Sequence, residues 1–359
     1  MKVLLSCGGT GGHIYPAIAI ADKIKEKDPN ASVLFVGTKT GMENRLVPAA
    51  GYEIKGIKAS GFKRRHLLSN IDTLKDAVEG GKEVEQILSD FKPDIVIGTG
   101  AYVTGVVLLH AHRRGIRCII HEQNAVPGLT NKIVSRFVDR VFISFKNTEK
   151  AFAHPDRVIF SGNPIRSDFE KITKEDARKE LDFSNDDVIV LATGGSLGAE
   201  ILNREVIDFS KEIDRYKIKL IFVTGKRYYD DVKAKCSADN LTLLDYANNM
   251  PVLMKAADVI VSRAGAIAVS EILASGKPSI LIPSPNVTNN HQYHNAKAIA
   301  DEGAAILLEE KDLAEGEGTL SSEILSLLSR PEDLSGMGVR AKNLACLNAS
   351  DIIYSNLNK

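Results

Sequence analysis

Short apolar runs rich in Val and Ile recur along the chain, between longer stretches with helical periodicity. The runs cover residues 3–6, 33–37, 95–98, 117–120, 140–143 and 158–161, then 188–192, 219–223, 241–244, 259–261, 279–282 and 305–308. Runs of this kind are typical of parallel strands that helices cover on both faces. Because the pattern restarts after the sixth run, it predicts an α/β protein with two doubly wound, Rossmann-like domains of similar size.

A Gly- and Pro-containing segment, SGNPIR at 161–166, separates the two series of runs. Gly and Pro interrupt regular structure, and 359 residues are too many for one compact core. We therefore expect an N-terminal domain over 1–163 and a C-terminal domain over 164–341. A C-terminal helix over about 342–359 is expected to pack back on the first domain.

The composition is that of an ordinary globular protein, with 44% hydrophobic and 26% charged residues. The four cysteines, Cys7, Cys118, Cys236 and Cys346, are too widely spaced for a zinc knuckle or a disulfide framework, which favours a reducing compartment. The first apolar run is too short for a signal peptide, and no window approaches about 18 uncharged apolar residues. We expect a cytoplasmic chain that does not span a membrane.

Charge is unevenly distributed along the chain. Residues 1–163 carry 23 Lys and Arg against 16 Asp and Glu, whereas the remainder carries 23 against 30. A basic half indicates an anionic partner, such as phospholipid, a polyphosphate or nucleic acid. The segment FKRRHLL at 62–68 places three consecutive cations between apolar residues and is suited to an anionic bilayer surface; a solvated basic loop is the alternative.

Four glycine-containing turns follow predicted strands and precede predicted helices. They are GGTGGH at 8–13, GTGAY at 98–102, TGGSLGA at 193–199 and RAGA at 263–266. Such turns expose backbone N–H groups at helix N-termini, at the sheet edge where open parallel sheets bind ligands. Any one of them can be a packing requirement. Four of them, divided between both domains, predict a phosphate-containing ligand in an interdomain cleft.

Several phosphate and metal chemistries do not match the sequence. No turn has the Walker pattern, and the first turn lacks both GxGxxG and an acid after the second strand, so NAD binding is the less favoured interpretation. Asp-x-Asp and HExxH are absent. We expect a site without metal or cofactor, in which N–H groups, helix dipoles and cations such as Arg166 or Arg263 stabilise a leaving diphosphate.

Polar residues follow several of the predicted strands. His13 can act as general base on a sugar hydroxyl, as a substrate contact or as a helix cap. In HEQN at 121–124, Asn124 can bind a sugar hydroxyl, and a buried hydrogen-bond network is the alternative. Glu271, on an apolar helix, suits the two ribose hydroxyls, with a salt bridge as the alternative. NNHQ at 289–292 is rich in groups that recognise sugar hydroxyls.

Together these motifs resemble the MurG family of glycosyltransferases, and the resemblance covers nearly the whole chain. The ordered set is GGTGGHIYPAIA (8–19), GTGAY (98–102), HEQNAVPGLTN (121–131), GNPIR (162–166), GGSLGA (194–199), SRAGAIAVSE (262–271) and NNHQ (289–292). Members of this family add N-acetylglucosamine to the undecaprenyl-diphosphate-linked muramoyl-pentapeptide of peptidoglycan synthesis, lipid I. The resemblance implies a GT-B fold, with lipid I held mainly by the first domain and UDP-N-acetylglucosamine mainly by the second.

The resemblance also implies roles for individual residues in an inverting displacement by the muramoyl 4-hydroxyl. The turn at 8–13 would hold the acceptor diphosphate and present His13 to the hydroxyl, and the turn at 194–199 would hold the donor diphosphate. The implied substrate contacts are Thr10, Gly11, Gly12, Tyr102, Asn124, Arg166, Ser196, Ala247, Arg263, Ala266, Ile267, Ala268, Val269, Ser270, Glu271 and Gln292. Of these, Arg166 and Ser196 would hold donor phosphate, Ala247 would contact uracil through its backbone, and Gln292 would bind the transferred sugar.

Two positions depart from the family pattern. Leu197 stands where many relatives have Gln, and His291 stands where some have the first Gln of a pair. As partners we expect the two substrates and an anionic membrane surface, contacted by 62–68 at the cytoplasmic face, and no nucleic acid. Two other functions stay open: a UDP-N-acetylglucosamine 2-epimerase or a transferase for another acceptor, and a non-catalytic nucleotide-sugar sensor.

Overall fold

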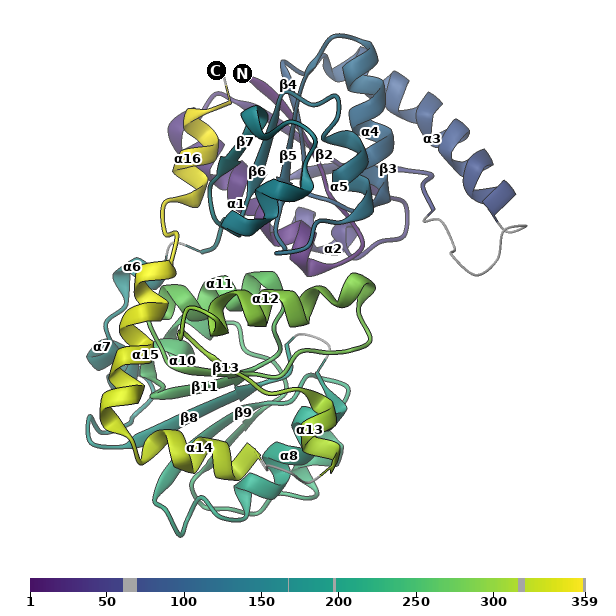
Figure 1. The fold of residues 1–359 in the computed structure, drawn as a ribbon. Coiled ribbons are helices and arrows are strands. Elements are labelled where there is room, and N and C mark those ends of the chain that lie inside the picture. Colours follow the sequence, from purple (N-terminus) through teal and green to yellow (C-terminus); the bar gives the residue numbers. More distant parts are fainter. Residues whose placement is uncertain (61–69, 167, 196–197, 316–319, 358–359) are drawn as a thin grey trace. The chain divides into compact units, whose positions relative to one another are not determined.

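The computed structural model describes residues 1–60, 70–166, 168–195, 198–315 and 320–357 (Figure 1). The chain forms two compact units, Met1–Ile165 with Asn348–Lys359, and Arg166–Leu347. The basic segment 62–68 and the predicted contact Ser196 lie outside the described residues, as does Leu197.

The first unit is built on a seven-stranded parallel sheet in the order β3-β2-β1-β4-β5-β6-β7. Its strands are β1 Lys2–Ser6, β2 Ser32–Thr38, β3 Glu53–Ile57, β4 Ile95–Gly98, β5 Arg117–Glu122, β6 Arg140–Ile143 and β7 Val158–Phe160. Its helices are α1 Gly11–Lys27, α2 Glu43–Ala49, α3 Asn70–Phe91, α4 Tyr102–Arg113, α5 Leu129–Val134, the 3-10 helices η2 Lys146–Ala151 and η3 Pro155–Arg157, and α16 Ala349–Ser355.

Successive residues of β1 explain why helices cover both faces of this sheet. Val3 and Leu5 pack in one cluster with residues of α1 such as Ile20, whereas Leu4 packs in another with residues of α4 such as Val107. All of these side chains are buried. A strand that is apolar on both faces therefore reads as a continuous run in the sequence, which is the pattern that predicted this sheet.

The second unit is built on a six-stranded parallel sheet in the order β10-β9-β8-β11-β12-β13. Its strands are β8 Val188–Thr193, β9 Ile218–Val223, β10 Leu241–Leu244, β11 Val259–Ser262, β12 Ser279–Leu281 and β13 Ile306–Leu307. Its helices are α6 Asp168–Lys171, α7 Lys174–Glu180, α8 Glu200–Ser210, α9 Tyr229–Lys233, α10 Met250–Ala256, α11 Ala266–Ser275, η4 Thr288–Asn290, α12 His291–Ala300, α13 Glu310–Glu315, α14 Leu320–Leu328 and α15 Pro331–Leu344. The predicted fold class, two doubly wound parallel sheets, is confirmed.

The C-terminal segment contains two helices in place of the single one expected over about 342–359. α15 packs against α11 in the second unit, and its last residue is followed by extended backbone at Ala345. α16 packs against α1 in the first unit (Figure 1), where Lys23 forms a 3.2 Å ion pair with Asp351. Among the helices of the described residues, none is both long and apolar enough to cross a membrane.

Candidate functional site

The first glycine turn connects β1 to α1. Gly9 has φ +80°, a left-handed conformation that glycine adopts without strain. α1 begins at Gly11, and Thr10 precedes it as the N-cap residue without a capping hydrogen bond from its side chain. Thr10 and Gly12 are exposed, and His13, the third residue of the helix, is half-buried. The positive end of the helix dipole and its first N–H groups therefore lie beside His13.

A buried carboxylate that sequence reasoning missed holds this turn in place. Glu43, fully buried at the start of α2, accepts hydrogen bonds from the Gly9 N–H at 3.2 Å, the Thr38 N–H at 2.8 Å and the Thr38 hydroxyl at 2.7 Å. Three donors compensate a carboxylate that would otherwise be costly to bury. The only available signal was a lone Glu just after two glycines, Gly37 and Gly41, which is too common a pattern to identify it.

A chain of hydrogen bonds joins the first turn to the end of β5. The Nδ1 atom of His13 lies 2.9 Å from Oε1 of Gln123, whose Nε2 donates to the Thr99 carbonyl at 2.8 Å and lies 3.0 Å from Nδ1 of His121. The Nε2 atom of His121 lies 3.0 Å from the Gly162 carbonyl oxygen. His121 and Gln123 are buried, so for these two residues the network interpretation of 121–124 holds.

Glu122 and Asn124 form a separate arrangement. Glu122 is buried and accepts hydrogen bonds from the Asn124 N–H at 3.0 Å, the Gly128 N–H at 3.0 Å and the Asn131 amide at 2.8 Å. It also accepts from the Asn124 side chain at 3.2 Å. Glu122 thus fixes the loop after β5 and orients Asn124, which is half-buried at the same end of the sheet as His13.

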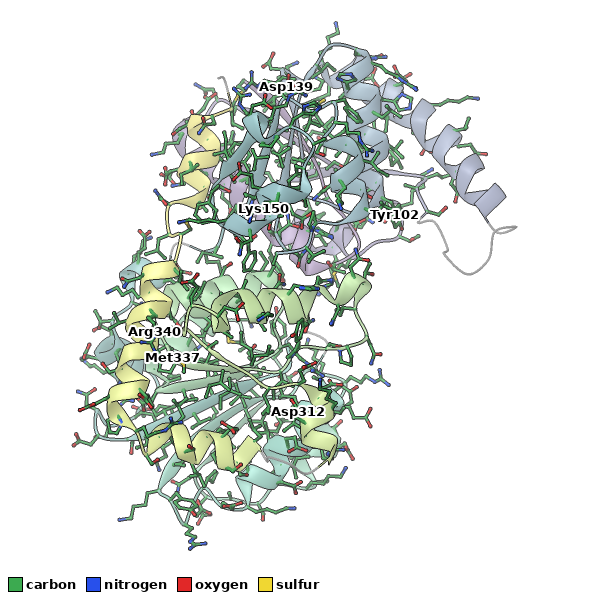
Figure 2. The ribbon with its side chains drawn as sticks, in the orientation of Figure 1. Tyr102, Asp139, Lys150, Asp312, Met337 and Arg340 are labelled. Atoms are coloured by element: carbon green, nitrogen blue, oxygen red, sulfur yellow. The ribbon has the colours of Figure 1, made fainter. Side chains whose placement is uncertain are left out.

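The second glycine turn packs directly against His13. Gly100 has φ +121°, and a Cβ atom there would lie 2.6 Å from Nδ1 of His13. Ala101, with φ +69°, adopts the same left-handed region at a steric cost that often marks functional turns. Tyr102 begins α4 and is 40% exposed (Figure 2). The first unit therefore gathers the predicted residues Thr10, Gly11, Gly12, His13, Tyr102 and Asn124 around the carboxyl ends of β1, β4 and β5.

The burial of His121 predicts a pH dependence of stability. Burial lowers the pKa of His121 to about 4, from 6.5 in the unfolded chain. Between these values the unfolded chain binds a proton that the folded chain does not, so the free energy of unfolding falls as the pH falls from about 6.5 to about 4. At about 1.4 kcal/mol per pKa unit, His121 accounts for about 3 to 4 kcal/mol of that loss.

Urea titrations at pH 7 and pH 4.5, followed by circular dichroism, measure this effect. We expect the His121→Asn variant to lose less stability over that interval than the wild type. His112→Asn, at an exposed position on α4, is the matched control and should keep the wild-type pH dependence. Equal pH dependence in all three proteins would contradict the assignment.

In the second unit, the turn after β8 leads into α8. Gly195 N–H donates to the Thr193 hydroxyl at 3.2 Å, and Gly198 N–H donates to the Gly195 carbonyl at 3.0 Å. A Cβ atom at Gly194 would lie 2.6 Å from the backbone nitrogen of Ala199. The turn closes so tightly on itself that Gly194 has no room for a side chain, which is typical of loops whose backbone N–H groups bind phosphate.

Arg166 and Glu271 form an ion pair. The Arg166 Nη2 atom lies 3.2 Å from Oε1 of Glu271, and Nη1 donates to the Asn248 carbonyl at 3.2 Å, next to Ala247. The Glu271 side chain is 13% exposed, whereas that of Arg166 is 45% exposed. Burial raises the pKa of Glu271, and Arg166 partly opposes this shift. Arg166, Ala247 and Glu271, predicted separately, are thus brought together.

Arg263 is more enclosed than the sequence suggested. It forms an ion pair with Glu310, in which both side chains are nearly buried, and donates to the Ile282 carbonyl at 3.0 Å. Its charge is therefore balanced within the unit. Along α11, Ile267, Ala268 and Ser270 are half-buried, but Ala266 and Val269 are buried, and the Val269 side chain is 0% exposed. Val269 is buried because it lies on a different face of the helix from its half-buried neighbours.

The NNHQ motif forms a strained start to α12. Asn289 and Asn290 have φ values of +54° and +49°. Gln292 is half-buried, and its Oε1 accepts a hydrogen bond from the Ser284 N–H at 2.9 Å. This bond fixes the Gln292 side chain at the carboxyl end of β12. It uses the side-chain oxygen and does not involve the amide nitrogen. Within the described parts of both units, no three His, Cys, Asp or Glu side chains gather as metal ligands would.

Comparisons with known proteins identify the family. Residues 3–143 match the glycosyltransferase family 28 N-terminal domain, and residues 189–351 match its C-terminal domain. A relative from Acetivibrio thermocellus is 47% identical over 99% of this chain and 96% of its own, and one from Clostridioides difficile is 42% identical over 100% and 89%. Both are named UDP-N-acetylglucosamine–N-acetylmuramyl-(pentapeptide) pyrophosphoryl-undecaprenol N-acetylglucosamine transferase.

Solved structures agree with this assignment. MurG of Acinetobacter baumannii matches with a TM-score of 0.79 and 27% identity over 99% of both chains. A UDP-N-acetylglucosamine 2-epimerase from Neisseria meningitidis matches with a TM-score of 0.69 over 100% of both chains, but at 17% identity it shows only a shared fold. The chain therefore belongs to the MurG family of glycosyltransferases, with the GT-B fold of two Rossmann-like units.

Proposed function

We propose that this chain transfers N-acetylglucosamine from UDP-N-acetylglucosamine to the 4-hydroxyl of undecaprenyl-diphospho-N-acetylmuramoyl-pentapeptide, lipid I, and so makes lipid II for peptidoglycan synthesis. The observation that carries this proposal is the full-length similarity to transferases of that name, at 47% identity in one case. The arrangement of His13 and of the Arg166–Glu271 pair supports it with chemistry suited to the reaction.

The first unit supplies the groups for the acceptor. His13 takes the proton of the 4-hydroxyl through its Nε2 atom, which makes no hydrogen bond within the described residues, while Nδ1 is held by Gln123. The N–H groups at the start of α1, next to Thr10, Gly11 and Gly12, bind the acceptor diphosphate. Tyr102 and Asn124 contact the acceptor sugar.

The second unit supplies the groups for the donor. The turn at 194–199, with Ser196, and the N-terminus of α11 bind the diphosphate of UDP, and Arg166 balances its charge as it leaves. Glu271 accepts hydrogen bonds from the ribose hydroxyls, the backbone near Ala247 contacts uracil, and Gln292 binds the transferred sugar. The 4-hydroxyl oxygen forms a bond to the anomeric carbon as its bond to UDP breaks, which inverts the configuration there.

The role of Glu271 predicts a change in donor affinity. Glu271→Gln removes a charge-assisted acceptor for the ribose and weakens the ion pair with Arg166. Loss of one such hydrogen bond corresponds to an increase of about 10- to 100-fold in KM for UDP-N-acetylglucosamine, with a smaller change in kcat. Steady-state kinetics with saturating acceptor measure this.

Glu205→Gln is the matched control for that variant. Glu205 lies on α8, its side chain is 11% exposed, and it is paired at 3.0 Å with the exposed Arg204, so it resembles Glu271 in burial and partner. This variant should keep the wild-type KM. A donor KM that is unchanged in Glu271→Gln would remove the residue from the proposed ribose contact.

The membrane association is a separate part of the proposal. Lipid I is anchored in the bilayer, so we place the enzyme peripherally at the cytoplasmic face, in contact with anionic lipid through the basic segment 62–68. Three consecutive cations flanked by apolar residues support this, since neither the charges nor the apolar residues alone would give stable binding.

Release of UDP tests the proposed reaction against the alternatives. We expect UDP to appear from UDP-N-acetylglucosamine only when a lipid-linked muramoyl acceptor is present, and to appear equally in EDTA. A 2-epimerase would instead convert UDP-N-acetylglucosamine to its 2-epimer without acceptor, and a non-catalytic sensor would bind the nucleotide sugar without releasing UDP. Either of these outcomes would contradict the proposal.

A further inference from the structure

The hydrogen-bond chain from Gly162 to His13 determines which nitrogen of each histidine carries a proton. The Gly162 carbonyl oxygen can only accept, so the His121 Nε2 atom, 3.0 Å away, must carry the hydrogen. His121 is neutral, because burial lowers its pKa to about 4. Its Nδ1 atom is therefore an acceptor, and it faces the Gln123 amide.

The orientation of Gln123 follows from that acceptor. With Nε2 toward β5, the amide donates to the Thr99 carbonyl at 2.8 Å and to the His121 Nδ1 atom at 3.0 Å. The reverse orientation would place Oε1 against a carbonyl oxygen and a nitrogen lone pair in a buried site, with no donor to compensate. The Oε1 atom of Gln123 is thus directed at His13, and as an acceptor it requires a hydrogen on the His13 Nδ1 atom.

We propose that His121 and Gln123 are positioning residues that fix His13 as the Nδ1–H tautomer and leave the Nε2 lone pair for the acceptor hydroxyl. This inference rests on the proposed function only for the use of Nε2; the tautomer itself follows from the hydrogen-bond partners. Gln123 is neutral, so it selects the tautomer and ring orientation without adding the negative charge that a carboxylate partner would supply.

Nitrogen NMR of the protein labelled with ¹⁵N-histidine tests the tautomer directly. We expect the wild-type His13 signals, identified by their loss in His13→Gln, to be those of an Nδ1–H ring at neutral pH. In Gln123→Met, which keeps the side-chain length but removes both polar atoms, the ring should shift toward the Nε2–H form and kcat should fall by about 10- to 100-fold, with little change in either KM. His112→Gln should change neither.

The outcomes separate this proposal from the function on which it rests. A wild-type His13 in the Nε2–H form would overturn the proposal without any variant, and so would unchanged kcat in a folded Gln123→Met protein. An Nδ1–H ring in a protein that transfers no N-acetylglucosamine would instead contradict the proposed function.

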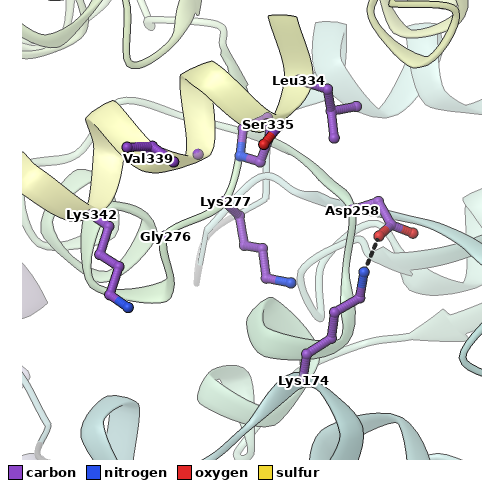
Figure 3. Close-up of a pocket in the computed structure, with 10 residues that line it drawn as sticks. Lys174, Asp258, Gly276, Lys277, Leu334, Ser335, Val339 and Lys342 are labelled. Atoms are coloured by element: carbon purple, nitrogen blue, oxygen red, sulfur yellow. Dashed lines mark hydrogen bonds and ion pairs between the residues drawn. The ribbon is translucent and has the colours of Figure 1, made fainter. Parts of the chain in front are cut away.

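The second unit also has a pocket at the end of its sheet where the strands begin. This cavity of about 340 Å³ lies where β11 and β12 begin, whereas the predicted donor contacts lie where strands end. Lys174 of α7, Lys277 before β12 and Lys342 of α15 line it, together with Asp258 (Figure 3). We call it the lysine pocket.

The lysine pocket has an excess of positive charge with an unmatched buried cation. Asp258 already accepts from Lys174 at 2.7 Å, Arg178 at 2.8 Å and the Ile189 N–H at 2.8 Å. Lys277 is only 9% exposed and forms no hydrogen bond or ion pair within the described residues. Burial, with Lys174 nearby, lowers the pKa of Lys277 to about 7. An anion bound beside Lys277 would compensate for its desolvation.

We infer that the lysine pocket binds a phosphate group. Phosphate has the charge to match Lys277 and enough oxygens to accept from the nearby Lys174 ammonium group as well. The apolar side chains of Pro278, Leu334 and Val339 complete the wall, so the phosphate can belong to a lipid headgroup or to a soluble molecule.

Calorimetric titration with inorganic phosphate at pH 7 tests the site. We expect binding to the wild type and at least about 10-fold weaker binding to Lys277→Met. Lys211→Met, at an exposed lysine of the same unit, is the control and should bind as the wild type. No phosphate binding, or equal binding to Lys277→Met, would overturn the inference. If Lys277→Met also lowers sedimentation with phosphatidylglycerol vesicles relative to phosphatidylcholine vesicles, the source is a lipid headgroup; if sedimentation is unchanged, it is a soluble phosphate.

Discussion

Replacement of His13 by alanine is expected to lower kcat for transfer by about 100- to 10,000-fold, the usual contribution of a general base. The ring is half-buried, and its only hydrogen bond within the described residues is that to Gln123. Its loss therefore removes the proton acceptor and little of the packing. The measurement is kcat with both substrates saturating, alongside the thermal unfolding temperature.

The control for this variant is His112→Ala, at an exposed position on α4. It should retain wild-type kcat, and both variants should unfold near the wild-type temperature. Normal turnover in a folded His13→Ala protein would remove His13 as the base and leave its alternative role as a substrate contact.

Gly100→Ala is expected to lower kcat by about 100-fold, although the residue contacts no substrate in the proposed reaction. A Cβ atom at this position would lie 2.6 Å from Nδ1 and 2.7 Å from Cε1 of the His13 ring. The ring must move by several tenths of an ångström or more, which breaks its alignment with Gln123 and misplaces Nε2. Displacement of a catalytic group by about 1 Å costs about 100-fold in rate.

Gly115→Ala separates this effect from backbone strain. Gly115 has φ +69°, and a Cβ atom there would meet nothing within 4 Å. Alanine at this position therefore has the conformational cost of a left-handed backbone but makes no clash. We expect Gly115→Ala to lose some stability and to keep its kcat. Equal kcat losses in the two variants would show that the contact with His13 is not responsible.

The fold was predictable because most strands are buried on both faces. The strand that the apolar runs missed, β3, lies at the sheet edge, and its sequence EIKGI alternates between exposed and half-buried positions before Ile57. Prediction also ended the run at 117–120 too early. β5 continues to Glu122, because the polar side chains of His121 and Glu122 are buried with hydrogen-bond partners and do not end the strand.

Local sequence suggested candidate site residues, whereas contacts made by packing could not be predicted. His13 and Glu271 were proposed from their places next to glycine turns, and their roles in the reaction stay predictions. The support that Glu43 gives to the first turn, and the Arg263–Glu310 ion pair, join segments that are distant in the sequence. Neither the periodicity of the sequence nor the spacing of its motifs predicts such pairs, because only the fold brings their side chains together.

The most direct test of the central claim is identification of the product formed from UDP-N-acetylglucosamine and a short-chain analogue of lipid I. We predict a lipid-linked disaccharide in which N-acetylglucosamine is joined to the muramoyl 4-hydroxyl with inverted, β configuration, as NMR of the purified product can establish. A product with retained configuration would contradict the proposed displacement. Absence of any disaccharide, with the nucleotide sugar either unchanged or epimerised, would contradict the transferase function itself.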